Sequence, residues 1–123
     1  MQLILVMIGG ALGSGARHLA GRAIGAADGT TLPYATLTVN LVGGMLMGLL
    51  VGALGRFGGN DAWRLFVGVG ILGGFTTFSA FSLDIVTLAE RGAPGIAVGY
   101  ALLSVLGSVL ALFAGLMLAR SVA

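Results

Sequence analysis

Three hydroxyl-bearing residues share one face of the last apolar stretch of the sequence. Tyr100, Ser104 and Ser108 are spaced four residues apart, so in a helix they form a column two turns long. Each hydroxyl can donate a hydrogen bond to an anion or to water. A single serine could instead donate to a carbonyl of its own helix, but three in register favour a polar track.

Asn40 is a further polar side chain inside a hydrophobic run, "TLTVNLVGG", residues 36–44. A polar group at membrane depth costs free energy unless it faces protein or water, which makes it a candidate for function. Its amide has two N–H donors. Two roles remain open: a donor in the same site as the hydroxyl column, or a hydrogen bond that holds two helices together.

The stretch "GGFTTFSAF", residues 73–81, combines two glycines with two β-branched threonines in an apolar segment. Both residue types disfavour a helix, so we expect a helix to be interrupted here. In hydrocarbon, non-helical backbone survives only where it is buried in protein or lines a cavity. The carbonyls freed by such a break could coordinate a cation, as unwound helices do in sodium-coupled transporters.

Phe78 and Phe81 follow the expected break and are neighbours on one helical face. A phenyl ring is positive at its edge, so rings presented edge-on to a pathway would attract a small anion. Taken alone, the two rings fit simple packing better than this role.

The composition is that of a membrane protein. Of the 123 residues, 58% are hydrophobic and only 8% are charged, whereas a soluble domain has about 25% charged residues. Apolar runs at about 2–24, 33–55, 63–89 and 95–119 are each long enough to cross a bilayer. The first run lacks the basic leading region of a signal peptide, so we interpret it as a span. We expect one all-α domain, residues 1–123, of four transmembrane helices joined by short turns, the third helix broken mid-membrane.

Glycines recur at a spacing of four residues, which favours close packing between helices in a membrane. The repeats are Gly9 and Gly13; Gly44, Gly48 and Gly52; and Gly70 and Gly74. Four thin helices enclose little volume, so we expect an oligomer.

The basic residues are all arginines and are balanced across the membrane. Three belong to the side of the termini and the middle loop, and three to the other side: Arg56, Arg64 and Arg120 against Arg17, Arg22 and Arg91. Orientation normally follows a Lys/Arg excess on one side. The tie leaves two options, insertion in both orientations with an inverted copy as partner, or orientation decided by one arginine or the free N-terminus.

Three segments resemble, in order, the signature segments of the Fluc/CrcB fluoride channels: "GGALGSGARH" (9–18), "TLTVNLVGG" (36–44) and "GILGGFTTFSAFSLD" (70–84). The resemblance covers essentially the whole chain. It implies a bacterial inner-membrane channel that lets fluoride out passively and so lowers cytoplasmic fluoride. It also implies an antiparallel, dual-topology homodimer with two pores and a structural sodium ion at its interface.

The resemblance also implies roles for individual residues. The sodium ion would be held by the backbone carbonyls of Gly73 and Thr76 from both copies, and Arg17 would lie near the aqueous vestibule. The fluoride pathway would be lined by Asn40, Thr77, Phe78, Ser79, Phe81, Tyr100, Ser104 and Ser108. Three positions depart from the family pattern, since His18 stands where an aromatic is usual, Gly15 where alanine is common and Ala80 where a hydroxyl residue is usual.

Two other functions compete with a fluoride channel. A small multidrug transporter is also short, four-spanning and dual in topology, but it needs a carboxylate in its first span, and no Asp or Glu precedes Asp28. A non-transporting scaffold subunit would explain the glycine repeats but not the hydroxyl column or the break. An enzyme is not expected, because the single histidine, His18, has no evident triad or metal partner.

Overall fold

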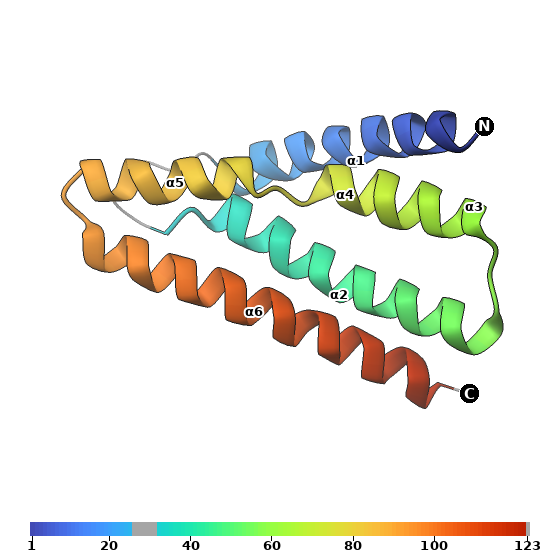
Figure 1. Ribbon diagram of the computed structural model, residues 1–123. Coiled ribbons are helices and arrows are strands. Elements are labelled where there is room, and N and C mark those ends of the chain that lie inside the picture. The colour runs from blue at the N-terminus through green and yellow to red at the C-terminus, as the bar shows by residue number, and fades with distance from the viewer. Residues whose placement is uncertain (26–31, 123) are drawn as a thin grey trace.

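The computed structural model describes residues 1–25 and 32–122, and the described chain is helical throughout its regular parts (Figure 1). The expected first turn, residues 25–31, lies outside the described residues except for Gly25. The elements are α1 (Gln2–Ile24), α2 (Tyr34–Phe57), α3 (Asp61–Trp63), the π-helical η1 (Arg64–Leu72), α4 (Gly73–Phe75), α5 (Ser79–Glu90) and α6 (Pro94–Ser121).

Four of these segments are long and apolar enough to cross a membrane: Gln2–Ile24, Tyr34–Phe57, Asp61–Glu90 and Pro94–Ser121. The third span is made of α3, η1, α4 and α5 in succession. The prediction of an all-α protein with four spans is therefore confirmed.

Local chemistry sets the helix ends. Pro94 is the first residue of α6, where its missing N–H and fixed φ cost nothing. Asn60 caps α3, because its side-chain oxygen accepts the N–H of Trp63 at 3.2 Å. Gly92 turns the chain after α5 with a φ of 82°, a backbone conformation that favours glycine.

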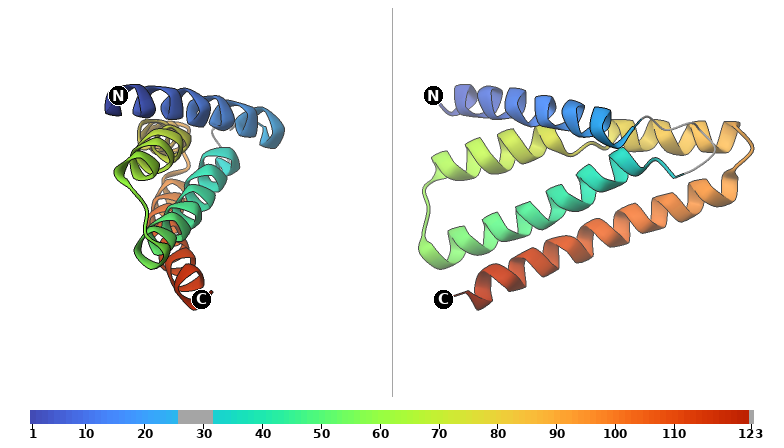
Figure 2. Two further views of the ribbon diagram at one scale, coloured as in Figure 1. Left: turned by 90° about the vertical axis from the view of Figure 1, so that its right-hand side faces the viewer. Right: turned by 180° about the vertical axis from the view of Figure 1, so that it is seen from behind.

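The four spans lie roughly alongside one another, and both termini are at the end of the molecule where α2 connects to α3 (Figures 1 and 2). The most extensive packing is between α2 and α6, followed by α1 against η1 and α4. Beyond the break, α5 packs against α6. Four crossings with both termini on one side follow from this arrangement.

The glycine repeats lie at these helix contacts, which confirms the prediction of close packing. A Cβ at Gly48 of α2 would overlap the carbonyl oxygen of Leu112 in α6, and a Cβ at Gly115 would overlap that of Met45. A Cβ at Gly13 of α1 would overlap the carbonyl oxygen of Ile71. Backbones thus meet directly, as small residues allow in membranes.

The buried core is small and sits where α5, α6 and the start of α2 meet. Its members are Leu37, Phe81, Leu88, Ala97 and Tyr100. Large hydrophobic side chains elsewhere, including most of those on α1 and α6, are exposed. An apolar outer surface of this extent requires lipid or a protein partner.

Candidate functional site

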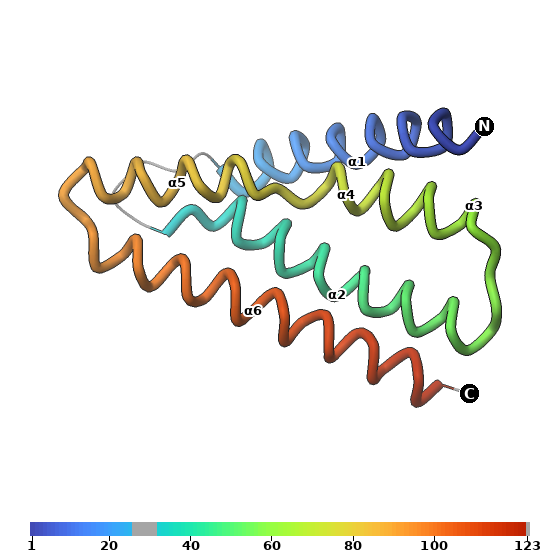
Figure 3. Tube along the Cα trace, viewed as in Figure 1, coloured from blue at the N-terminus to red at the C-terminus, as the bar shows by residue number. Residues whose placement is uncertain are grey.

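Helical backbone is lost at Thr76–Phe78, between α4 and α5, where the trace straightens (Figure 3). Thr76 is extended, with φ −82° and ψ 158°. Its N–H and its Oγ1 both donate to the carbonyl of Leu72, at 3.0 and 2.9 Å. The threonine side chain thereby helps to close the last turn of α4, since it supplies a second donor at the helix end.

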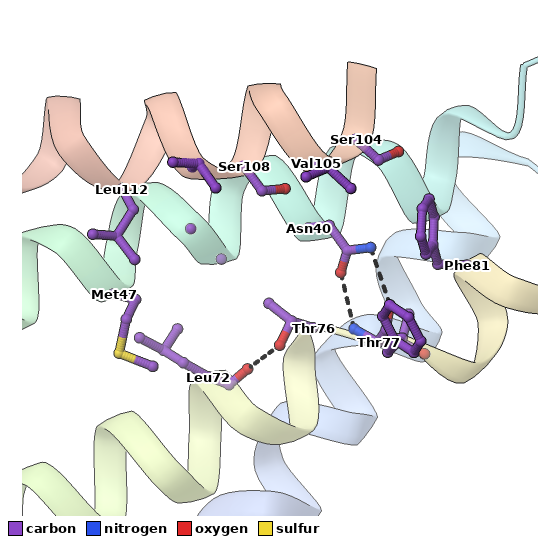
Figure 4. Close-up of a pocket in the computed structure, with 14 residues that line it drawn as sticks. Asn40, Met47, Leu72, Thr76, Thr77, Phe81, Ser104, Val105, Ser108 and Leu112 are labelled. Carbon is purple, nitrogen blue, oxygen red and sulfur yellow. Dashed lines mark hydrogen bonds between the residues drawn. The ribbon is translucent and has the colours of Figure 1, made fainter. Parts of the chain in front are cut away.

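The side chain of Asn40 in α2 bonds to both backbone groups of Thr77 (Figure 4). Its Oδ1 accepts the Thr77 N–H at 2.9 Å, and its Nδ2 donates to the Thr77 carbonyl at 3.1 Å. In an unbroken helix the Thr77 N–H would bond to the carbonyl of Gly73. Asn40 therefore supplies both hydrogen-bond partners of the Thr77 backbone at this non-helical position.

Helix α5 begins with a cap from the same residue. The Oγ1 of Thr77 accepts the N–H of Ala80 at 3.1 Å, a bond that satisfies one of the free donors at a helix N-terminus. The Oγ of Ser79 lies 3.4 Å from this hydroxyl, and Ser79 is exposed. Thr77 thus bonds both to Asn40 of α2 and to the first turn of α5.

A cavity of about 430 Å³ opens beside the break, between α2, α5 and α6 (Figure 4). Six of the residues predicted for the fluoride pathway line it together: Asn40, Thr77, Phe78, Phe81, Ser104 and Ser108. Tyr100 and Ser79, which were predicted for the same pathway, are not among the lining residues. Among the described residues that line this cavity, none is charged.

Two of the lining residues, Ser104 and Asn40, have a hydrogen-bond donor without a partner in the described part of the chain. Ser104 is only 4% exposed, and its Oγ has no hydrogen-bond partner within the described part of the chain. Asn40 uses one of its two amide N–H groups on Thr77, which leaves the other available. A buried hydroxyl without a partner is costly, which makes Ser104 a candidate for function.

Two aromatic contacts connect the cavity to the core. The ring of Phe81 lies 5.6 Å from that of Phe78 and 5.3 Å from that of Tyr100, each pair tilted by about 55°. Tilted rings at this distance bring positive edges towards neighbouring groups. Phe81 is buried, whereas Phe78 is exposed at the rim.

The hydroxyl of Tyr100 points elsewhere, because it donates to Oδ2 of Asp84 in α5 at 3.1 Å. This bond between Tyr100 and Asp84 was not predicted from the sequence. The sequence does contain a signal for it, because Asp84 is a carboxylate inside an apolar segment and needs a hydrogen-bond donor nearby.

Arg17 belongs to a second cavity, of about 450 Å³, together with His18 and Arg22 of α1 and Asp84 of α5. Its Nε donates to the carbonyl of Gly74 at 3.2 Å. The family resemblance implied that Arg17 lies near a vestibule, and a cavity that also includes His18 and Arg22 is compatible with that prediction. Its contact with the break was not anticipated.

The residues predicted to hold sodium lie at the break. Within the described residues, the hydrogen bonds at the break leave the carbonyls of Gly73 and Thr76 without a donor, because Thr77 bonds to Asn40 and Ala80 to Thr77. The described part of the chain has no group of three acidic, histidine or cysteine side chains that could hold a metal ion. Carbonyl oxygens are ligands that hard cations prefer.

Comparison with known proteins relates this chain to a family. Residues 4–116 match the family described as CrcB-like protein, Camphor Resistance (CrcB). The chain is 57% identical to a fluoride-specific ion channel FluC of Chelativorans sp. (strain BNC1), over 98% of both chains. It is 53% identical to a protein of the same name from Mesorhizobium japonicum, over 98% of this chain and 97% of the relative. It is also 53% identical to one from Sphingopyxis alaskensis, over 97% of this chain and 95% of the relative.

Proposed function

This chain belongs to the CrcB-like family, and we propose that it is a fluoride channel, a multi-pass protein of the bacterial membrane. Four helices of suitable length and composition carry it across the bilayer. Family relatives are named as ion channels, so its task is transport and not catalysis. Passive exit of fluoride would lower the concentration of the ion in the cytoplasm.

The observation that supports this function best is the unpartnered hydroxyl of Ser104. Fluoride is small and strongly hydrated, so a pathway must replace its water with hydrogen-bond donors. Ser104 lines the same cavity as Asn40, Ser108 and the rings of Phe78 and Phe81, and its hydroxyl is buried at the cavity wall. All of these groups are neutral. Conduction requires binding that is weak enough for release, and a file of neutral donors meets this need better than a buried arginine would.

The active unit in this proposal is an inverted pair of subunits with two pores. Phe78 at the rim of the cavity is 77% exposed in a single chain, and an exposed ring at a functional site calls for a partner surface. The balanced arginines, three on each side, favour insertion in both orientations. A second copy would also cover part of the exposed apolar surface.

A structural sodium ion would brace the centre of this pair. The residues fit the ion, because the carbonyls of Gly73 and Thr76 are uncharged oxygen ligands that no donor within the described residues satisfies. One chain offers too few ligands for a closed shell, so both copies would contribute. When bound, the ion would offset the repulsion between these carbonyls.

Fluoride efflux from liposomes tests the function directly. Purified protein is reconstituted into vesicles loaded with potassium fluoride, and a potassium ionophore is added to remove the opposing voltage. Rapid fluoride release that depends on the protein is expected, with chloride released far more slowly from matched vesicles. Equal rates for the two anions would contradict a fluoride-specific pathway.

The topology of the pair is tested by labelling. The chain has no cysteine, so a single cysteine added at either terminus is a unique target. Dual insertion predicts that a membrane-impermeant reagent labels about half of the tag from each side of the membrane. Labelling from one side alone would contradict the inverted pair.

A further inference from the structure

Arg17 contacts the break in the third span, although it lies in the first. Its side chain is half-buried, and its Nε donates to the carbonyl of Gly74 at 3.2 Å. Gly74 belongs to the last turn before the break. The guanidinium therefore satisfies a carbonyl at a helix end, where the backbone has no helical donor.

Close packing between the two helices brings Arg17 to this position. A Cβ at Gly74 would lie 2.6 Å from the carbonyl oxygen of Gly10 and 3.2 Å from the backbone N of Ser14. A Cβ at Gly13 would lie 2.8 Å from the backbone N of Phe75. Arg17 stands one turn after Gly13 on the same face of α1, so its side chain reaches just past the last glycine contact.

The carbonyls at the break fall into two groups. Leu72 accepts from Thr76, and Gly74 accepts from Arg17. Gly73, which lies between them, loses its helical donor to Asn40. Arg17 thus fixes the peptide next to the carbonyl that the proposed sodium site would use, without occupying that carbonyl.

We propose that Arg17 is a positioning residue that fixes the break through the Gly74 carbonyl, so that its hydrogen bond matters more than its charge. The expected effect on conduction rests on the proposed function, whereas the hydrogen bond between Arg17 and Gly74 does not depend on it. A bond from α1 prevents the end of α4 from rotating, and thereby holds the peptides of Gly73 and Thr76 in place.

A comparison with Arg22 separates two possible roles of Arg17, its charge and its hydrogen bond to Gly74. It lines the same cavity as Arg17 and carries the same charge, but it lies on α1 beyond the helix break, near the end of the helix. If charge in the cavity were the relevant property, removing either arginine would have a comparable effect. If the bond to Gly74 is the relevant property, only Arg17 is sensitive.

The test uses two substitutions at each position. Glutamine places an amide nitrogen at the same number of bonds from the backbone as the arginine Nε, so Arg17→Gln keeps a donor and loses the charge. Arg17→Met loses both and keeps a similar length. Arg22→Gln and Arg22→Met are the matched controls. Fluoride efflux, its dependence on sodium concentration, and amide hydrogen exchange over residues 72–80 are measured for the four variants and the parent.

The expected result is a rescue by glutamine at position 17. Arg17→Met should slow efflux, raise the sodium concentration for half-maximal efflux and accelerate exchange at the break, each about tenfold, the loss typical of a hydrogen bond to a charged group. Arg17→Gln should stay within about threefold of the parent in all three measurements, because a neutral donor to the carbonyl is weaker but present. Both Arg22 variants should leave exchange and sodium dependence unchanged.

Two results would overturn the inference: equal defects in Arg17→Gln and Arg17→Met, or an Arg22→Met defect that matches Arg17→Met. Failure of the proposed function looks different. In that case the parent protein releases no fluoride, whereas faster exchange in Arg17→Met alone would still support the contact with the break.

Discussion

Phe78 and Phe81 lie ring to ring at 5.6 Å, yet Phe78 is 77% exposed and Phe81 only 7%. The two residues have the same side chain and differ by less than one turn of chain. Phe81 is anchored by its contact with Tyr100, whereas Phe78 stands at the rim of the cavity. One ring therefore belongs to the buried core, and the other lies exposed at the rim of the cavity.

Replacing each phenylalanine by isoleucine should separate stability from conduction. Phe81→Ile should lower the free energy of unfolding by about 1–2 kcal/mol, since it leaves a gap in a buried site. Phe78→Ile should leave the stability of the single subunit nearly unchanged. Both changes should reduce fluoride efflux severely, because each removes a ring from the cavity.

Thermal unfolding in detergent and efflux from liposomes measure the two effects. Phe113→Ile is the control, because Phe113 is exposed on α6 and does not line the cavity. It should preserve both quantities. Normal efflux in Phe78→Ile and Phe81→Ile would reduce the rings to packing residues.

The bond between Tyr100 and Asp84 predicts a stability effect of its own. Asp84→Ala removes the acceptor and leaves a buried tyrosine hydroxyl unpaired, which should cost about 1–3 kcal/mol. Asp84→Asn keeps an acceptor oxygen and should cost less. Thermal unfolding of the two variants is compared with that of Tyr100→Phe combined with Asp84→Ala. The combined variant should regain part of the loss seen in Asp84→Ala, and a combined variant no more stable than Asp84→Ala would show that the unpaired hydroxyl carries no cost.

Glycine contacts between α2 and α6 predict a position-dependent response to alanine. At Gly115 a methyl group overlaps the carbonyl oxygen of Met45, so Gly115→Ala should destabilise the fold by about 1–3 kcal/mol. At Gly99 of the same helix nothing lies within 4 Å. Gly99→Ala should therefore be neutral or stabilising by up to about 1 kcal/mol. Similar unfolding temperatures for both variants would contradict the close approach of the two helices.

Much of the fold follows from local properties of the sequence. Apolar runs of membrane length, separated by short polar turns, predict the four spans, because length and composition decide whether a segment can cross a bilayer. The non-helical residues Thr76–Phe78 lie within the stretch 73–81 that its glycines and threonines single out. Glycine spacing similarly predicts which helix faces meet closely.

Contacts between distant residues are harder to predict. The column of Tyr100, Ser104 and Ser108 defines a helix face, but not the neighbour that each hydroxyl meets. Ser104 and Ser108 line the cavity, while Tyr100 turns to Asp84 on another helix. The bond from Arg17 to Gly74 is likewise set by helix packing across 57 positions of sequence, which no local pattern records.

Ser104→Ala provides the sharpest separation of function from stability. The hydroxyl of Ser104 is buried without a partner within the described residues, so its removal breaks no hydrogen bond in that part of the chain. Stability should be unchanged or slightly higher, because an unpaired buried polar group is costly. Fluoride efflux should nevertheless fall about tenfold, the effect of one lost hydrogen bond to an ion. Ser82→Ala on α5 is the control, since Ser82 does not line the cavity. Unchanged efflux in Ser104→Ala would remove this hydroxyl from the pathway.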